Sequence, residues 1–88
     1  MDDLQIIELY FARDERAIKE TDTKYGKLCF NVANNILGNI HDSEECVNDT
    51  YLSVWNKIPP TRPNHFMAFV CKITRNLSLK KLEYKMAL

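Results

Sequence analysis

Residues 42–60 have the sequence DSEECVNDTYLSVWNKIPP, which contains the clearest helical pattern of the chain. Its apolar side chains recur at the spacing of one helix face, on Val47, Tyr51, Val54, Trp55 and Ile58. The acidic start at Asp42 resembles a capping box, and Pro60 ends the pattern because it disfavours helical geometry in the preceding residue. The sequence therefore predicts a helix that begins at Asp42 and stops at Pro59.

The same periodicity predicts three further helices, over about residues 3–12, 14–37 and 65–84. Gly38 marks the end of the second helix because glycine readily adopts the left-handed conformation, and Asn64 is expected to cap the fourth. Gly26 lies inside the second helix, where we expect a neighbouring helix to pack closely. No segment alternates apolar and polar residues, so we predict an all-α bundle of three long helices and one short N-terminal helix, forming a single domain over residues 1–88.

Composition excludes several classes of protein. The chain has 88 residues, of which 45 % are hydrophobic, with only two Gly and three Pro, as expected for a folded domain rather than a disordered one. It has neither a membrane-length apolar run nor a secretory signal, so no membrane partner and a cytoplasmic location are expected. The three cysteines are too widely spaced for zinc and odd in number, which predicts buried free thiols: Cys29, Cys46 and Cys71. No catalytic, metal or cofactor motif is present, so neither an enzyme nor a small-molecule substrate is expected.

The net charge of zero hides a strong asymmetry along the chain. Residues 1–56 contain eleven acidic and five basic side chains, whereas residues 57–88 contain one acidic and seven basic. The two halves therefore carry opposite charge, and the zero total does not exclude a nucleic-acid partner.

Two helix faces carry side chains that a plain bundle does not require. Opposite the apolar face of the third helix lie Glu45, Asn48, Asp49, Leu52 and Asn56. This is either a solvated face with one isolated leucine or a docking surface for a basic partner, anchored by Leu52. On the fourth helix and the loop before it lie Lys57, Arg62, Asn64, Lys72, Arg75, Asn76 and Lys80. This second set is either solvated or binds nucleic acid, while the nearby Trp55, Phe66 and Phe69 are expected in the core.

Two motifs resemble conserved region 2 of bacterial sigma-70 factors, most closely the extracytoplasmic-function group. Residues 42–55, DSEECVNDTYLSVW, are similar to the family signature DAEDxVQETFLxVW, and residues 66–76, FMAFVCKITRN, are similar to FxxWLxRIARN. Phe69 replaces the tryptophan of the second motif. Shorter similarities at Tyr25-x-x-Leu28 and at residues 36–39 extend the resemblance over nearly the whole chain.

The resemblance implies a transcription initiation factor domain. It implies that the outer face of the third helix docks on a coiled coil of the large clamp subunit of RNA polymerase core. The loop and fourth helix would recognise and melt the promoter −10 element through its non-template strand, with a loop pocket that captures a flipped base. An anti-sigma factor is a further partner of such domains. The family's −35-recognising helix-turn-helix domain has no counterpart here, so we expect an isolated or truncated region 2. The competing hypothesis is a helical protein-interaction module that binds no nucleic acid.

Overall fold

Each predicted apolar stripe folds into one helix in the computed structural model, which describes all of residues 1–88. The helices are α1 (Asp3–Phe11), α2 (Arg16–Leu37), α3 (Ile40–Lys57) and α4 (Phe66–Ala87). No strand is present, which confirms the predicted all-α class with three long helices and a short leading one. None of the helices has the combination of length and hydropathy that crossing a membrane requires.

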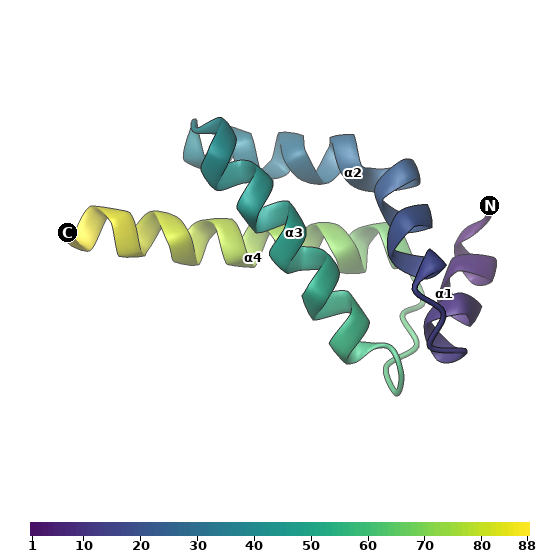
Figure 1. Cartoon of the computed structure of the whole chain (residues 1–88). Helices are drawn as coiled ribbons and strands as arrows, with labels where there is room; N and C mark the ends of the chain where they lie inside the picture. The colour runs from purple at the N-terminus through teal and green to yellow at the C-terminus, as the bar shows by residue number, and fades with distance from the viewer.

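The three long helices pack against one another, and α1 covers one end of the bundle. In Figure 1, α2 and α4 lie lengthwise, α3 crosses them at an angle, and α1 lies beside the loop that leads into α4. α2 contacts both α3 and α4, while α1 contacts α2 and the first part of α4. The domain measures 41 × 22 × 20 Å, so every helix has one side turned to solvent. The segment between α3 and α4, residues 58–65, is called the connecting loop below.

The core is small and draws on all four helices. Only 18 of the 88 residues are buried, because each helix of so thin a bundle has just one inward face. The largest fully buried side chains include Tyr10 of α1 and Phe66 of α4, whose rings lie 6.1 Å apart. Trp55 and Phe69 are half-buried and pack against this cluster. The prediction that these aromatic residues belong to the core is therefore confirmed.

Buried hydroxyl groups join the helices where they cross. The Thr50 and Thr74 hydroxyls lie 2.9 Å apart between α3 and α4, and the Tyr10 and Thr21 hydroxyls lie 2.6 Å apart between α1 and α2. Thr21 donates to the carbonyl four residues earlier in its own helix, and of Thr50 and Thr74 one donates to the other hydroxyl while the other donates to the carbonyl four residues earlier. No buried side-chain nitrogen or oxygen lacks a hydrogen-bond partner, so hydrogen bonds offset the cost of burying these polar groups.

Two predicted helix starts were wrong. α3 begins at Ile40 rather than Asp42, because Asn39 is its cap and accepts a 2.9 Å hydrogen bond from the Asp42 backbone amide. α4 begins at Phe66 with His65 in the cap position and without a side-chain cap bond, so Asn64 does not cap it. The predicted end of α2 is confirmed, since Gly38 adopts the left-handed conformation with φ +60°.

Gly26 lies where α2 and α3 approach closely, as predicted. A methyl group at this position would lie 3.2 Å from the Tyr51 hydroxyl and 2.5 Å from Asp22 Oδ1. The Tyr51 hydroxyl donates a 2.5 Å hydrogen bond to that Asp22 oxygen. Burial of the hydroxyl, together with the neighbouring Asp22 carboxylate, raises the pKa of Tyr51. The missing side chain at Gly26 therefore leaves room for a hydrogen bond between the two helices.

Candidate functional site

The α3 outer face comprises five exposed residues on one side of α3. Its members are Glu45, Asn48, Asp49, Leu52 and Asn56. The buried residues of α3, among them Val47, Thr50 and Val54, occupy the opposite side. Leu52 is 59 % exposed, so its side chain is available to an apolar partner. The structure thus brings together all five residues that the helical spacing had placed on one face.

A shallow hollow extends the α3 outer face toward α4. It is lined by Asp49, Leu52, Ser53, Asn56, Lys57 and Leu77. Leu77 comes from α4 and was not among the predicted site residues, because its place beside Leu52 depends on how the two helices cross. Lys57, predicted to lie in the loop before the fourth helix and to contact DNA, is instead the last residue of α3 and lines this hollow. The hollow therefore combines two leucines with one acidic and one basic side chain.

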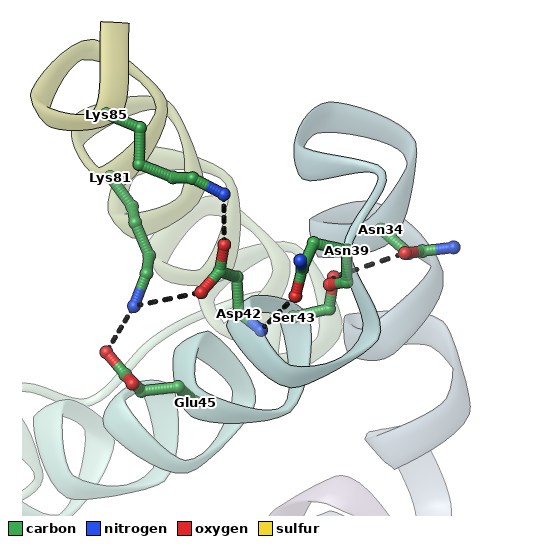
Figure 2. Close-up of polar contacts among 7 residues, drawn as sticks. All are labelled: Asn34, Asn39, Asp42, Ser43, Glu45, Lys81 and Lys85. Atoms are coloured by element: carbon green, nitrogen blue, oxygen red, sulfur yellow. Dashed lines mark hydrogen bonds and ion pairs between the residues drawn. The ribbon is translucent and has the colours of Figure 1, made fainter. Parts of the chain in front are cut away.

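One member of the α3 outer face, Glu45, is already bound within the chain. Its carboxylate pairs with Lys81 of α4, and Lys81 also lies 3.8 Å from Asp42, which in turn pairs with Lys85 (Figure 2). The hydrogen bond from Lys85 lowers the pKa of Asp42, and the Glu45 carboxylate raises the pKa of Lys81. A basic partner that binds Glu45 must compete with Lys81.

The ion pairs lie next to a hydrogen-bonded joint between α2 and α3, also drawn in Figure 2. The Ser43 hydroxyl donates to the Asn39 carbonyl at 2.6 Å and lies 3.3 Å from Asn34 Oδ1. Together with the Asn39 cap, these contacts hold the start of α3 against the end of α2. Asp42 thereby faces Lys85 from a fixed position.

The α4 basic row consists of four exposed polar residues on one side of α4. They are Lys72, Arg75, Asn76 and Lys80. None of the four side chains has a hydrogen-bond or ion-pair partner within the chain, whereas Lys81 and Lys85 on the same helix are both paired. Unpaired cations with an amide among them can bind phosphate oxygens and base edges. The row is therefore the part of α4 that is free to bind an anionic ligand.

The connecting loop encloses a second hollow, against α1 and α2. This loop hollow has a volume of about 430 Å³ and is lined by Asp3, Leu4, Ile7, Tyr25, Pro63, Asn64, His65, Phe66, Met67 and Ala68. Its walls are mainly apolar, and its rim carries the exposed Asn64, which was predicted to contact DNA. The contributions of α1 and α2 were missed from the sequence, because these residues are distant along the chain from the connecting loop.

One wall of the loop hollow is fixed by hydrogen bonds to Asp3. The Tyr25 hydroxyl donates to Asp3 Oδ1 at 2.6 Å, and Lys24 Nζ lies 2.8 Å from the same oxygen. Partial burial opposes ionisation of Asp3, but these two donors outweigh it and lower the pKa of the carboxyl group. Asp3 therefore carries a negative charge beside the hollow at neutral pH.

Arg62, another predicted DNA contact, is bound to α1 instead of facing solvent freely. Its Nη1 donates to Glu8 Oε1 at 2.6 Å, and its guanidinium carbon lies 4.2 Å from the centre of the Phe11 ring. Arg62 is therefore paired within the chain, unlike the cations of the α4 basic row.

The cysteines form no disulfide and no metal centre. Cys29 and Cys46 are buried, as predicted, while Cys71 is only half-buried. Burial raises the pKa of all three thiols, which makes them poor nucleophiles at neutral pH. No three His, Cys, Asp or Glu side chains lie close enough to bind a metal ion.

Comparison with known proteins yields one match. Residues 22–86, which include α3, the connecting loop and nearly all of α4, match the family model described as Sigma-70 region 2. No curated protein and no solved structure matches the chain significantly.

Proposed function

The chain belongs to the sigma-70 region 2 family, and from this premise we propose that its two surfaces bind different partners in transcription initiation. The family is one of transcription factor domains, not enzymes, whose general partners are RNA polymerase core and promoter DNA. We assign the chain to the extracytoplasmic-function group on the two motifs at residues 42–55 and 66–76. In this proposal the α3 outer face binds polymerase, and α4 with the connecting loop binds promoter DNA.

The DNA-binding role rests on the α4 basic row. Its unpaired cations lie on the helix that follows the connecting loop, so the proposed phosphate contacts and the loop hollow lie on adjacent segments. The proposed ligand is the non-template strand of the −10 element, with one unstacked base in the loop hollow. Extracting a base costs a few kcal/mol, which the phosphate contacts and the apolar walls would offset. The proposed contacts are Lys57, Asn64, Lys72, Arg75, Asn76 and Lys80, whereas Arg62 is held by α1.

A fluorescence anisotropy titration tests DNA binding. Labelled single strands that carry a −10 sequence are titrated with the wild-type chain and with the Arg75→Ala and Asn76→Ala variants. We expect both variants to bind more weakly, and Arg75→Ala also to lower the salt slope by about 0.7, the value for one phosphate contact on a single strand. Lys19→Ala is the matched control, because Lys19 is an exposed and unpaired cation of α2. Absence of binding at any salt concentration would refute this role and favour the protein-interaction module.

The docking role rests on the exposed Leu52 beside the Asp49 carboxylate. An apolar anchor ringed by polar groups is typical of an interface centre, and the acidic charge favours a basic partner. We propose that the partner is the coiled coil of the large clamp subunit, which Glu45, Asn48, Asp49, Leu52 and Asn56 would contact. An anti-sigma factor that covers the same face would compete for it.

Retention on immobilised core polymerase tests the docking role. The Leu52→Ala/Asp49→Ala double variant should be retained less than the wild-type chain. Leu28→Ala is a matched control, because Leu28 is also an exposed leucine (39 %), but lies on α2. Equal retention of the double variant and the wild-type chain would refute the assignment of this face.

A further inference from the structure

Two arginines tie the connecting loop to the N-terminal part of the chain. The first, Arg62, lies in the middle of the loop and contacts α1 twice, through the 2.6 Å bond to Glu8 and through its position over the Phe11 ring. Glu8 and Phe11 lie on successive turns of one helix face, so a single arginine spans both. The loop is thereby joined to a helix more than fifty residues earlier in the chain.

The second arginine, Arg13, holds the start of the same loop. It lies just after Ala12, the C-cap of α1, and donates from Nη1 to the carbonyls of Trp55, at 2.9 Å, and Ile58, at 2.7 Å. Its guanidinium carbon also lies 3.7 Å from the centre of the Trp55 ring. Ile58 is the residue where α3 ends and the loop begins. Arg13 adopts a positive φ of 54°, which is uncommon for a residue other than glycine and requires support from its surroundings.

We propose that α1 is a brace for the connecting loop, with Arg13 and Arg62 as positioning residues. Arg13 fixes the start of the loop, and Arg62 fixes its middle. The loop hollow lies next to the part of the loop that follows Arg62, because its lining includes Pro63 and Asn64 together with Leu4 and Ile7 of α1. This inference rests on the proposed function, because it is the unstacked base in the hollow that requires a fixed loop.

The Glu8→Gln substitution distinguishes two roles for Arg62: positioning the connecting loop, or contacting a phosphate of the DNA. If Arg62 bound phosphate, Glu8 would compete with the DNA, and Glu8→Gln would free the arginine and strengthen binding. If Arg62 positions the loop, Glu8→Gln removes its anchor and weakens binding. We expect a loss of about two- to fivefold, the range that one exposed ion pair supplies, with an unchanged salt slope. Glu15→Gln is the control for losing one negative charge, because Glu15 is exposed and has no ion-pair partner.

Arg13→Lys gives a second test in which the charge is retained. Lysine has no planar guanidinium, so it cannot stack on the Trp55 ring while one of its nitrogens donates to both carbonyls. We expect binding to fall about tenfold, because hydrogen bonds from a charged group are lost, again without a change in salt slope. An unchanged affinity in both Glu8→Gln and Arg13→Lys, or tighter binding in Glu8→Gln, would overturn the proposal.

Amide hydrogen exchange tests the brace without DNA. The Thr61 amide of the loop donates to the carbonyl of Lys57, the last residue of α3, at 2.9 Å, so its protection reports how well the loop is fixed against α3. Its exchange should accelerate in Glu8→Gln and Arg13→Lys and stay unchanged in Glu15→Gln. If the wild-type chain bound no DNA, the proposed function would be refuted, but the exchange rates would still show whether Arg13 and Arg62 fix the connecting loop. Equal Thr61 exchange in all four proteins would overturn the proposal that they do.

Discussion

Gly26 lies where Asp22 of α2 meets Tyr51 of α3, and replacing it with alanine has two opposing effects on stability. Alanine favours the helix over glycine by about 1 kcal/mol at an interior position. The added methyl group, however, would lie 2.5 Å from Asp22 Oδ1 and 3.2 Å from the Tyr51 hydroxyl. The Asp22 side chain must then rotate away, because a carbon and an oxygen cannot approach so closely.

The rotation breaks the hydrogen bond between Tyr51 and Asp22, which sets the size of the effect. A hydrogen bond to a charged group contributes about 1.5–3 kcal/mol, and Tyr51 is only 7 % exposed, so water replaces Asp22 poorly. Subtracting the helix-propensity gain leaves a net loss of about 0.5–2 kcal/mol for Gly26→Ala. In a domain of this size each 1 kcal/mol lowers the thermal midpoint by about 4–8 °C.

In a Tyr51→Phe background, we expect Gly26→Ala to raise the free energy of unfolding instead of lowering it. Phenylalanine has no hydroxyl, so the interhelical bond is already absent and Asp22 can move into solvent without further loss. Gly26→Ala should then stabilise the chain by up to about 1 kcal/mol. The four proteins of this double-mutant cycle are compared by urea unfolding followed by circular dichroism. A stability change of the same sign in both backgrounds would refute the reasoning.

Three further substitutions test separate parts of the fold. Asn39→Ala should cost about 1 kcal/mol through loss of the α3 cap, and an unchanged urea midpoint would show that the cap contributes nothing. Because Lys85 lowers the pKa of folded Asp42, the Asp42 carboxylate stabilises the fold at neutral pH, and this contribution is lost as the pH falls from about 3.9 through the lower folded value. The difference in free energy of unfolding between the wild-type chain and Asp42→Asn, measured by urea unfolding, should therefore become smaller between about pH 5 and pH 3. A constant difference would contradict this stabilising role of the Asp42 carboxylate. Ile6→Val should cost about 0.5–1.5 kcal/mol in thermal unfolding, because Ile6 is fully buried, and no loss would mean that α1 is not part of the cooperative unit.

The sequence predicted the helices because the information for them is local. Apolar side chains at three- and four-residue spacing give each helix one inward face, and Gly38 and Pro59–Pro60 mark two helix ends. Cap assignment was less successful. Both Asn39 and Asp42 are good capping residues, and the choice between them depends on how the chain leaves α2.

The sequence predicted which site residues share a face of one helix, but not which side chains of different helices contact one another. The α3 outer face follows from helical spacing alone, and the structure keeps its five residues together. Which cations stay free does not follow from spacing. Lys81 pairs with Glu45, 36 residues away, and Arg62 pairs with Glu8, 54 residues away, whereas Lys72 has no partner. Such pairs arise only from the packing of whole helices, and no local pattern marks them.

The small core has a consequence for the lifetime of the chain. With 18 of 88 residues buried, the domain has a small core, and we expect its free energy of unfolding to be low. Any partner that binds only the folded form raises this free energy by mass action. A partner present at a hundred times its dissociation constant adds about 2.7 kcal/mol. An unassembled chain therefore visits the unfolded state about a hundredfold more often than an assembled one, and proteases act on that state. At that concentration, a polymerase that binds only the folded chain would also protect it from degradation.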